Sequence, residues 1–345
     1  MKKRWLSLLA SMVLVLALLT ACGGNKATSP KPDSDGTYTS SVFDTEKDSG
    51  NLTVRYLATK ETYQNGDSKV NVGDCTVCTS PEGLVMMIDC SNPAAFPEID
   101  EQLQKMGITK IDIFVMSHPH SDHIGSFVQI AEKYPIGQIY RNPHEYGSGT
   151  YQKAMETIER LGIPCAVLRD GDSFDFGQKV HVAVYNPDPE TEAAISEQYM
   201  EANNASIAMR LTYGDSSFWT SGDMYSPGED AMVARYGSAL QSDIMKMNHH
   251  GYDTSNGQAL IEAVHPLAAI SMHESVTSKT VARRYVASGA MDFYTCMDGT
   301  VRVRTAGDAV YDVQTQLVRT VTNIYGEPAA DGHYVLSRAQ QENKK

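Results

Sequence analysis

Four potential metal ligands within six residues place the strongest constraint on this chain of 345 residues. His118, His120, Asp122 and His123 directly follow a strongly apolar stretch at residues 111–116. That stretch predicts a buried strand. Alternate positions of a strand share a face, so His118 and His120 can point the same way, while Asp122 and His123 turn toward a second point. Imidazole and carboxylate suit zinc, manganese or iron, so the motif predicts two neighbouring metal ions rather than a histidine-rich surface loop.

The pattern of apolar residues along the body predicts a layered α/β domain, because strand-like and helix-like segments alternate. Helices are expected from Pro97 to Gly107, at residues 127–133 and near residues 150–161. Strands are expected at residues 52–57, 84–89, 111–116, 179–185, 206–213, 218–220, 301–305, 309–313 and 317–325.

The first 22 residues have the features of an export signal. Basic residues precede an apolar stretch from Trp5 to Leu19, and small residues lead to Cys22. The segment from Leu19 to Cys22 resembles a bacterial lipobox, in which the cysteine receives lipid; a plain signal peptide is the alternative. We therefore expect residues 1–21 to be a lipoprotein signal peptide. The protein would then be extracytoplasmic and held at the bacterial cell membrane through lipid on Cys22 alone.

The rest of the chain divides by composition. Residues 22–49 are polar and rich in Gly, Ser, Pro and Asp, which predicts a flexible tether after the lipidated cysteine. Residues 50–325 carry the alternating pattern of the folded domain, and residues 326–345 are expected to form a C-terminal tail with a frayed end.

The charge of the chain excludes one class of partner. A formal net charge of −13 offers no broad basic face for duplex nucleic acid, so no extended nucleic-acid surface is expected. An anionic substrate would need local positive charge, and a metal ion supplies it compactly.

Five cysteines follow Cys22, so they cannot all pair with one another. Cys75 and Cys78 have the C-x-x-C spacing, but their neighbours predict a strand, in which positions i and i+3 face opposite ways. This favours separate buried thiols, or one bridge to another part of the chain, over a redox or metal pair.

The ligand-rich motif resembles the signature of the metallo-β-lactamase fold superfamily. The resemblance covers about residues 50–305 and is strongest to exported hydrolases similar to the metallo-β-lactamase domain of ComEC competence proteins. It implies a four-layer αβ/βα sandwich. Further matching segments are Val72-Gly73-Asp74, Ile88-Asp89, Asn203-Asn204-Ala205-Ser206, Ser221-Gly222-Asp223 and His249-His250-Gly251.

The resemblance also implies a ligand set for two divalent ions, with zinc expected first and manganese or iron as alternatives. His249 remains an alternative to His250, and whichever does not ligate should contact substrate. The expected catalytic groups are Asp122, Asp223 and His249. The expected ligands are His118 and His120 for the first ion, Asp122, His123 and His250 for the second, and Asp223 for both.

The chain departs from the family pattern near the first ion. Many members carry another histidine shortly before the bridging aspartate, where this chain has asparagines and a serine at residues 203–206. His144 and His181 are possible substitutes, with a solvated or hydrogen-bonded histidine as the alternative for each.

Three further residues are expected at the substrate. Asn204, Tyr252 and His273 fall within or near the matched segments and are expected to bind substrate, although Tyr252 could instead pack as a pocket wall.

The motif and the resemblance together imply hydrolysis, because two ions can generate a metal-bound hydroxide and stabilise developing charge. No G-x-S-x-G elbow or Walker loop is present. The expected substrate is a phosphodiester or phosphoester, either a small molecule or a cell-envelope group. The alternatives are a lactone or β-lactam hydrolase, or a surface-binding lipoprotein that keeps the fold without turnover.

Overall fold

The computed structural model describes residues 41–59, 62–64, 68–70, 73–189, 202–319, 329 and 331–342. The predicted signal peptide, Cys22 and the first part of the predicted tether lie outside the described residues. Residues Asp35–Lys345 form one compact unit. Within the described ranges, no helix combines the length and the apolar character needed to cross a membrane.

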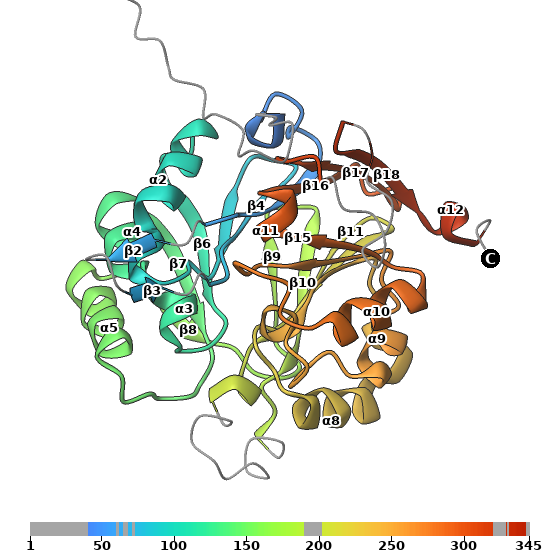
Figure 1. The fold of residues 1–345 in the computed structure, drawn as a ribbon. Helices are drawn as coiled ribbons and strands as arrows, with labels where there is room; N and C mark the ends of the chain where they lie inside the picture. The colour runs from blue at the N-terminus through green and yellow to red at the C-terminus, as the bar shows by residue number, and fades with distance from the viewer. Residues whose placement is uncertain are drawn as a thin grey trace, which may run out of the picture. The chain divides into compact units, whose positions relative to one another are not determined.

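Two large sheets form the body (Figure 1), and a short hairpin of β2 (Thr62–Gln64) and β3 (Ser68–Val70) lies outside them. One sheet has the order β18-β17-β16-β1-β4-β5-β6-β7-β8 and the other β15-β14-β13-β12-β11-β10-β9. The strands of the first are β1 (Leu52–Tyr56), β4 (Thr76–Thr79), β5 (Val85–Ile88), β6 (Ile111–Met116), β7 (Ile136–Arg141), β8 (Cys165–Val167), β16 (Val301–Thr305), β17 (Val310–Thr315) and β18 (His333–Ser337). Those of the second are β9 (Ser173–Phe176), β10 (Val180–Asn186), β11 (Ala208–Tyr213), β12 (Ser216–Thr220), β13 (Ile244–Lys246), β14 (Ala268–Ser271) and β15 (Met291–Tyr294).

Some helices begin and end at residues with clear local signals, as helix α5 (Gly149–Leu161) does. For example, the Ser148 side chain accepts a hydrogen bond from the Tyr151 amide at the start of α5, and Gly162 ends this helix in the left-handed region. The α-helices are α2 (Phe96–Lys105), α3 (Ser121–Ile124), α4 (Phe127–Lys133), α5 (Gly149–Leu161), α8 (Ser226–Tyr236), α9 (Gln258–Val264), α10 (Lys279–Ser288), α11 (Thr295–Asp298) and α12 (Arg338–Glu342). The 3-10 helices are η1 (Ser41–Phe43), η2 (Pro93–Ala95), η3 (Gly237–Leu240) and η4 (Asn248–Gly251).

Three apolar cores stack the elements into four layers, which confirms the predicted sandwich. Val54 and Phe218 belong to the core between the two sheets. Phe114 on β6 packs edge-on against Phe127 on α4, in the core that joins the first sheet to α2, α4 and α5. Trp219 and Tyr285 belong to the core between the second sheet and α8, α9 and α10, on the other side of the molecule (Figure 1).

Parallel strands bring many loop residues to one edge of each sheet. Strands β5 to β8 run parallel, as do β12 to β15, so their carboxyl ends lie together. Strand β4 runs antiparallel to β5, and Thr76 pairs with Ile88. The residues just before β4 therefore lie at the same edge as the end of β5. Loops at this edge are natural positions for a site.

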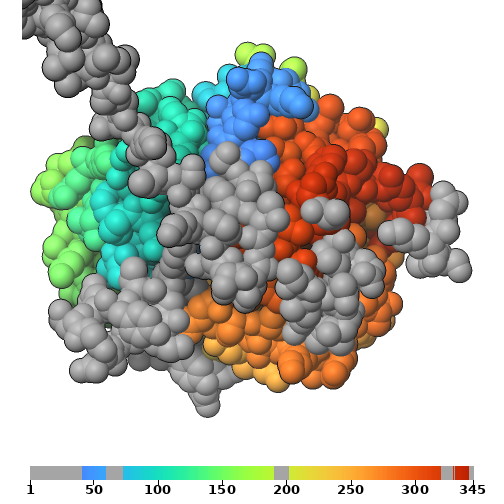
Figure 2. Space-filling view, turned by 45° about the horizontal axis from the view of Figure 1, so that its top comes forward, coloured from blue at the N-terminus to red at the C-terminus, as the bar shows by residue number. Residues whose placement is uncertain are grey.

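The N-terminal boundary of the folded domain differs from the prediction. Residues 41–49 were expected in the tether, but Val42 and Phe43 are buried. The Arg55 side chain donates to the Val42 carbonyl at 2.7 Å, and Arg302 donates to the Ser41 carbonyl at 3.0 Å. Figure 2 shows this segment in blue at the surface, between the cyan helix α2 and the orange-red C-terminal strands. By donating to these backbone carbonyls, Arg55 and Arg302 hold the segment on the first sheet.

The C-terminal boundary also differs. Strand β18 pairs with β17, and Arg338 of α12 donates to Asp243 Oδ1 at 2.8 Å, so these residues are not a tail. The strand expected at residues 317–325 is wrong for residues 317–319, since Arg319 leaves the sheet to pair with buried Asp298. Residues 320–325 lie outside the described residues.

The five cysteines of the described part are free thiols. Cys78 lies in the core between the sheets, whereas Cys75 faces the core beneath α2 and α4. The prediction that the two side chains face opposite ways is confirmed, and the alternative of a bridge is not.

Candidate metal centre

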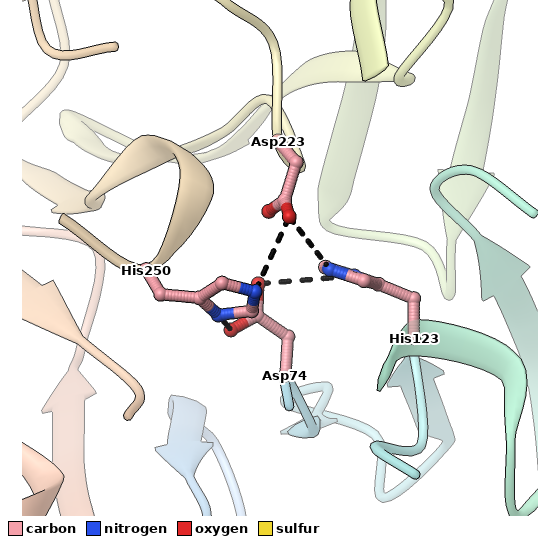
Figure 3. A group of neighbouring side chains, drawn as sticks. All are labelled: Asp74, His123, Asp223 and His250. Atoms are coloured by element: carbon pink, nitrogen blue, oxygen red, sulfur yellow. Dashed lines mark hydrogen bonds and ion pairs between the residues drawn. The ribbon is translucent and has the colours of Figure 1, made fainter. Parts of the chain in front are cut away.

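Two histidines, two aspartates and their neighbours meet where the sheets' loop-bearing edges come together. Asp74, His123, Asp223 and His250 each offer a ligand atom, and these four atoms lie within 4.8 Å of one another (Figure 3). Asp223 follows β12, His250 follows β13, His123 lies on α3 after β6, and Asp74 precedes β4. All four are buried. The cluster therefore draws on both sheets.

One oxygen of Asp223 lies between the two predicted ligand sets. Its Oδ2 is 3.1 Å from His123 Nε2 and 3.2 Å from His250 Nε2. The same oxygen lies 4.0 Å from His118 Nε2, which in turn is 3.1 Å from His120 Nδ1. This is the position that a bridging carboxylate requires.

Asp122 completes the second set. Its Oδ2 lies 3.2 Å from His250 Nε2 and 3.9 Å from His123 Nε2, and its side chain is one-third exposed. The structure therefore brings together all six residues predicted as ligands, namely His118, His120, Asp122, His123, Asp223 and His250.

Asp89 and Ser117 orient the histidines from behind. Asp89 Oδ2 lies 2.8 Å from His123 Nδ1 and accepts the Ser117 hydroxyl at 2.6 Å. The Ser117 oxygen is also 3.1 Å from His118 Nδ1. Partners of this kind fix the tautomer and the ring direction of a metal-ligating histidine. Asp89 belongs to the Ile88-Asp89 segment of the family resemblance, which by itself implies no role for this carboxylate.

Asp74 belongs to the Val72-Gly73-Asp74 turn of the family resemblance, and its partners are visible only in the folded structure. Its Oδ1 lies 3.0 Å from His250 Nδ1, and its Oδ2 contacts the Lys246 ammonium. His250 Nδ1 also lies 3.1 Å from the Met272 carbonyl. Nδ1 is thus engaged on the far side, so Nε2 is the nitrogen that faces the cluster.

Close backbone approach at the cluster requires glycine at two positions. A Cβ on Gly73 would lie 1.6 Å from the Asp122 carbonyl oxygen, because the two loops touch and the Asp74 amide donates to that oxygen. Gly222 has φ +52°, and a Cβ there would lie 2.7 Å from Ser206 Oγ. His249 and His250 also have positive φ, which places backbone strain in the loop that carries them.

The electrostatics of the cluster favour positive charge. Burial would lower the pKa of His123, but the carboxylates of Asp223 and Asp89 raise it well above its usual value. Asp223 and Asp74 raise the pKa of His250 in the same way against the effect of burial. Burial and the neighbouring imidazoles hold the pKa of His118 well below its usual value. Either a proton or a metal cation can balance the negative charge of these carboxylates.

The donor set fits first-row divalent ions. Neutral imidazole nitrogens and carboxylate oxygens are the ligands that zinc, manganese and iron accept. His123 Nε2 is buried, and within the described part of the chain it makes no hydrogen bond of acceptable geometry, as expected of a nitrogen directed at a cation. We therefore describe the cluster as a candidate di-metal ligand cluster.

An aromatic group adjoins the cluster on the His250 side. The His249 ring lies 5.0 Å from both Tyr225 and Tyr252, and its Nδ1 lies 2.6 Å from Thr254 Oγ1. Tyr252, which is 36% exposed, places its hydroxyl 3.4 Å from His273 Nε2. Burial lowers the pKa of His249 to about 4. His249, Tyr252 and His273 thus lie beside the cluster, where substrate contact was predicted.

Asn204, which was predicted to bind substrate, is buried beside the loop that carries Asp223. It is 1% exposed, and its Oδ1 accepts the Tyr225 amide at 3.2 Å. The Asn186 side chain donates to its carbonyl at 2.8 Å. Asn204 therefore supports the loop after Asp223, and its contact with substrate stays a prediction.

The two candidate substitutes for the missing histidine have different surroundings. His181 lies on β10 with an exposed side chain, 3.0 Å from Asp175, and is remote from the cluster by topology. His144 follows β7 near Tyr146, whose ring is 5.2 Å from that of His120. The structure therefore favours a solvated, hydrogen-bonded histidine at position 181. His144 instead lies near the His118–His120 pair.

These features define a two-sheet α/β protein with a candidate di-metal centre between its sheets. A family model described as "Metallo-beta-lactamase superfamily" matches residues 69–270, so the chain belongs to this superfamily.

Two curated relatives share part of this sequence. The chain is 26% identical over 228 residues to "Competence protein ComA" of Neisseria gonorrhoeae, which covers 63% of this chain and 29% of that protein. It is 22% identical over 170 residues to "ComE operon protein 3" of Bacillus subtilis, which covers 49% of this chain and 20% of that protein. The chain thus spans less than a third of the length of either relative.

Solved structures show only a distant likeness. The diiron β-hydroxylase CmlA from Streptomyces venezuelae has a TM-score of 0.47 and 11% identity, over 74% of this chain and 54% of that one. The fold protein YhfI from Bacillus subtilis has a TM-score of 0.45 and 11% identity, over 71% of this chain and 96% of that one.

Proposed function

We propose that this chain is an exported metal-dependent hydrolase that acts on a phosphodiester or phosphoester. The observation that carries the proposal is the position of Asp223 Oδ2, between the His118–His120 pair and the set formed by Asp122, His123 and His250. A shared carboxylate between two imidazole-rich sets is the arrangement that holds two cations close together.

The residues have distinct roles in this proposal. His118 and His120 hold the first ion, and Asp122, His123 and His250 hold the second, with Asp223 on both. Divalent ions bound there supply a strong nucleophile from water at neutral pH and stabilise developing negative charge. Zinc is the first expectation, with manganese or iron as alternatives.

The aromatic group orients the substrate. His249 is neutral near pH 7, since burial lowers its pKa to about 4, so it can accept or donate a hydrogen bond without adding charge. The partly exposed hydroxyl of Tyr252 and the adjoining His273 can contact an oxygen of the same substrate.

The charge of the molecule favours a small substrate or a group displayed on the cell envelope. A long polyanion would be repelled by a chain of net charge −13, whereas one phosphoester needs positive charge only at the cluster.

Kinetics with the full-length chain test the proposal. His120→Ala and Asp223→Ala should each lower hydrolysis of bis-p-nitrophenyl phosphate by about 100-fold or more, because each removes part of the electrostatic stabilisation. His181→Ala is the matched control, since this exposed histidine lies outside the cluster. A panel with phosphorylcholine esters, lactones and a cephalosporin ranks the substrates. Full activity in both cluster variants would place the site elsewhere, and no turnover of any substrate would favour a binding role.

We also propose that lipid on Cys22 holds the protein at the membrane. Its support is the lipobox-like segment that ends at this residue. Cys22→Ala should move the protein from the membrane fraction to the soluble fraction in cell fractionation. Persistent membrane association would instead indicate an uncleaved signal anchor.

A further inference from the structure

A buried lysine lies within the candidate metal centre. Lys246 ends β13, and its side chain is 2% exposed. Its ammonium contacts the Asp74 carboxylate, lies 3.3 Å from Asp223 Oδ1 and donates to the Gly222 carbonyl at 2.8 Å. Three oxygen acceptors match the three N–H donors of an ammonium. Each N–H donor of the Lys246 ammonium therefore has an acceptor, although a metal ion bound nearby would repel this charge.

These contacts give the two carboxylates unequal roles. Asp223 turns Oδ1 toward Lys246 and Oδ2 toward the imidazoles of His123 and His250. Both oxygens of Asp74 are engaged, Oδ1 by His250 Nδ1 and Oδ2 by Lys246. Asp74 is thus close enough to be a ligand, yet nitrogen donors occupy both of its oxygens.

Charge explains why a lysine can be tolerated there. The ammonium opposes any bound cation at close range. The carboxylates of Asp74 and Asp223 pair with the ammonium, and Asp122 beside His250 adds a third negative charge, so the cluster keeps an excess of negative charge. This negative charge offsets the repulsion between the ammonium and a bound cation. In return, Lys246 fixes the orientation of the Asp74 and Asp223 carboxylates.

We propose that Lys246 is a positioning residue that keeps Asp74 out of the metal ligand set and turns a single oxygen of Asp223 toward both ions. Asp74 then serves to orient His250. The inference rests on the proposed function in one respect, which is that divalent ions bind at this cluster.

Cobalt substitution of the full-length protein tests this inference. Cobalt(II) accepts the same ligands as zinc, and its visible absorption weakens as more ligands surround the ion. Lys246→Met keeps the length of the side chain and removes its charge. We expect the visible absorption per bound cobalt to fall in this variant, because Asp74 and the second oxygen of Asp223 become free to bind the ion.

Two further variants make the result specific. In the double variant Asp74→Asn, Lys246→Met, absorption should return part of the way to the wild-type value, because the Asp74 carboxylate is gone while Asp223 Oδ1 stays free. Asp74→Asn alone is nearly isosteric. Its remaining oxygen and the Met272 carbonyl can still accept from His250 Nδ1, and Lys246 stays paired with Asp223. This single variant should retain the wild-type cobalt spectrum, and it tests the inference even when Lys246→Met does not fold.

Arg319→Met is the matched control for breaking a buried ion pair, because Arg319 pairs with Asp298 outside the cluster and both are buried. Its cobalt spectrum should be unchanged. An unchanged spectrum in Lys246→Met, or a changed one in Asp74→Asn alone, would overturn the inference while leaving the proposed function in place. If the unaltered chain binds no cobalt, both fail.

Discussion

At the scale of single residues, three of the four histidines expected as ligands, His118, His123 and His250, are held in the same way. Each has one ring nitrogen held from behind, by Asp89 for His123, by Asp74 and the Met272 carbonyl for His250, and by Ser117 for His118. The other nitrogen then faces the cluster. Removing such a partner weakens metal affinity by about 10- to 100-fold in metalloproteins, although it is not a ligand itself.

Glu229 supports the histidine loop from one layer further out. This fully buried carboxylate accepts hydrogen bonds from the Asn248 side chain at 2.7 Å and from the Asn256 and Gly257 amides at 2.8 Å. Burial raises the pKa of Glu229 to about 7, although these donors oppose the shift. The folded protein therefore holds a proton on Glu229 that the unfolded chain loses near pH 4.5.

This shift predicts a pH-dependent stability. Between pH 4.5 and 7 the folded state binds more protons than the unfolded state, so stability falls as pH rises through this window. The loss is on the order of 3 kcal/mol. Urea unfolding at pH 5 and pH 8 should show it in the wild type and not in Glu229→Gln. Glu262→Gln, an exposed change on α9, is the control, and parallel pH profiles for wild type and Glu229→Gln would contradict the prediction.

The residues that sequence reasoning could identify are those with local signals. His118, His120, Asp122 and His123 are neighbours in the chain, so their spacing alone indicates a metal site. Lys246 lies in an ordinary apolar strand, and its role depends on loops more than 20 residues away in sequence. Asp74 and Asp89 likewise act through partners that only the folded chain supplies.

At the scale of elements, strands were predictable because buried parallel strands such as β6 form nearly continuous apolar runs, whereas the sandwich was implied by the family resemblance. The two ends of the domain could not be predicted from the sequence. Residues 41–49 have a tether-like composition, yet their backbone carbonyls serve as acceptors for Arg55, Arg302 and Arg304. Composition cannot show this, because the interaction uses main-chain atoms that every residue has.

Asp48 lies in this N-terminal segment and forms ion pairs with two of the arginines that hold the segment on the sheet. Its carboxylate lies 2.8 Å from both Arg55 and Arg304. Asp48→Ala should destabilise the fold by about 3–5 kcal/mol, because it removes the carboxylate paired with the buried guanidinium of Arg55 and one of the two paired with Arg304. Asp44→Ala is the control, since Asp44 is exposed and the arginines bind its backbone carbonyl. Chemical unfolding should separate the two variants; equal midpoints would contradict the prediction.

At the scale of the whole molecule, metal binding should stabilise the fold because the donors come from both sheets. Ions present at about 100 times their dissociation constant add about 2.7 kcal/mol to the free energy of unfolding. Calorimetry with and without a chelator should therefore show a lower unfolding temperature after metal removal. Asp223→Ala should respond much less, and an equal response in both proteins would show that the effect does not arise at this cluster.

The spread of the donors along the chain has a consequence for biosynthesis. His118 and His250 are separated by more than 130 positions, and the strands that carry them belong to different sheets. A nascent chain that ends before residue 250 lacks His250 and cannot form the complete ligand cluster. Complete binding of cations at this candidate cluster would therefore have to follow synthesis of residue 250.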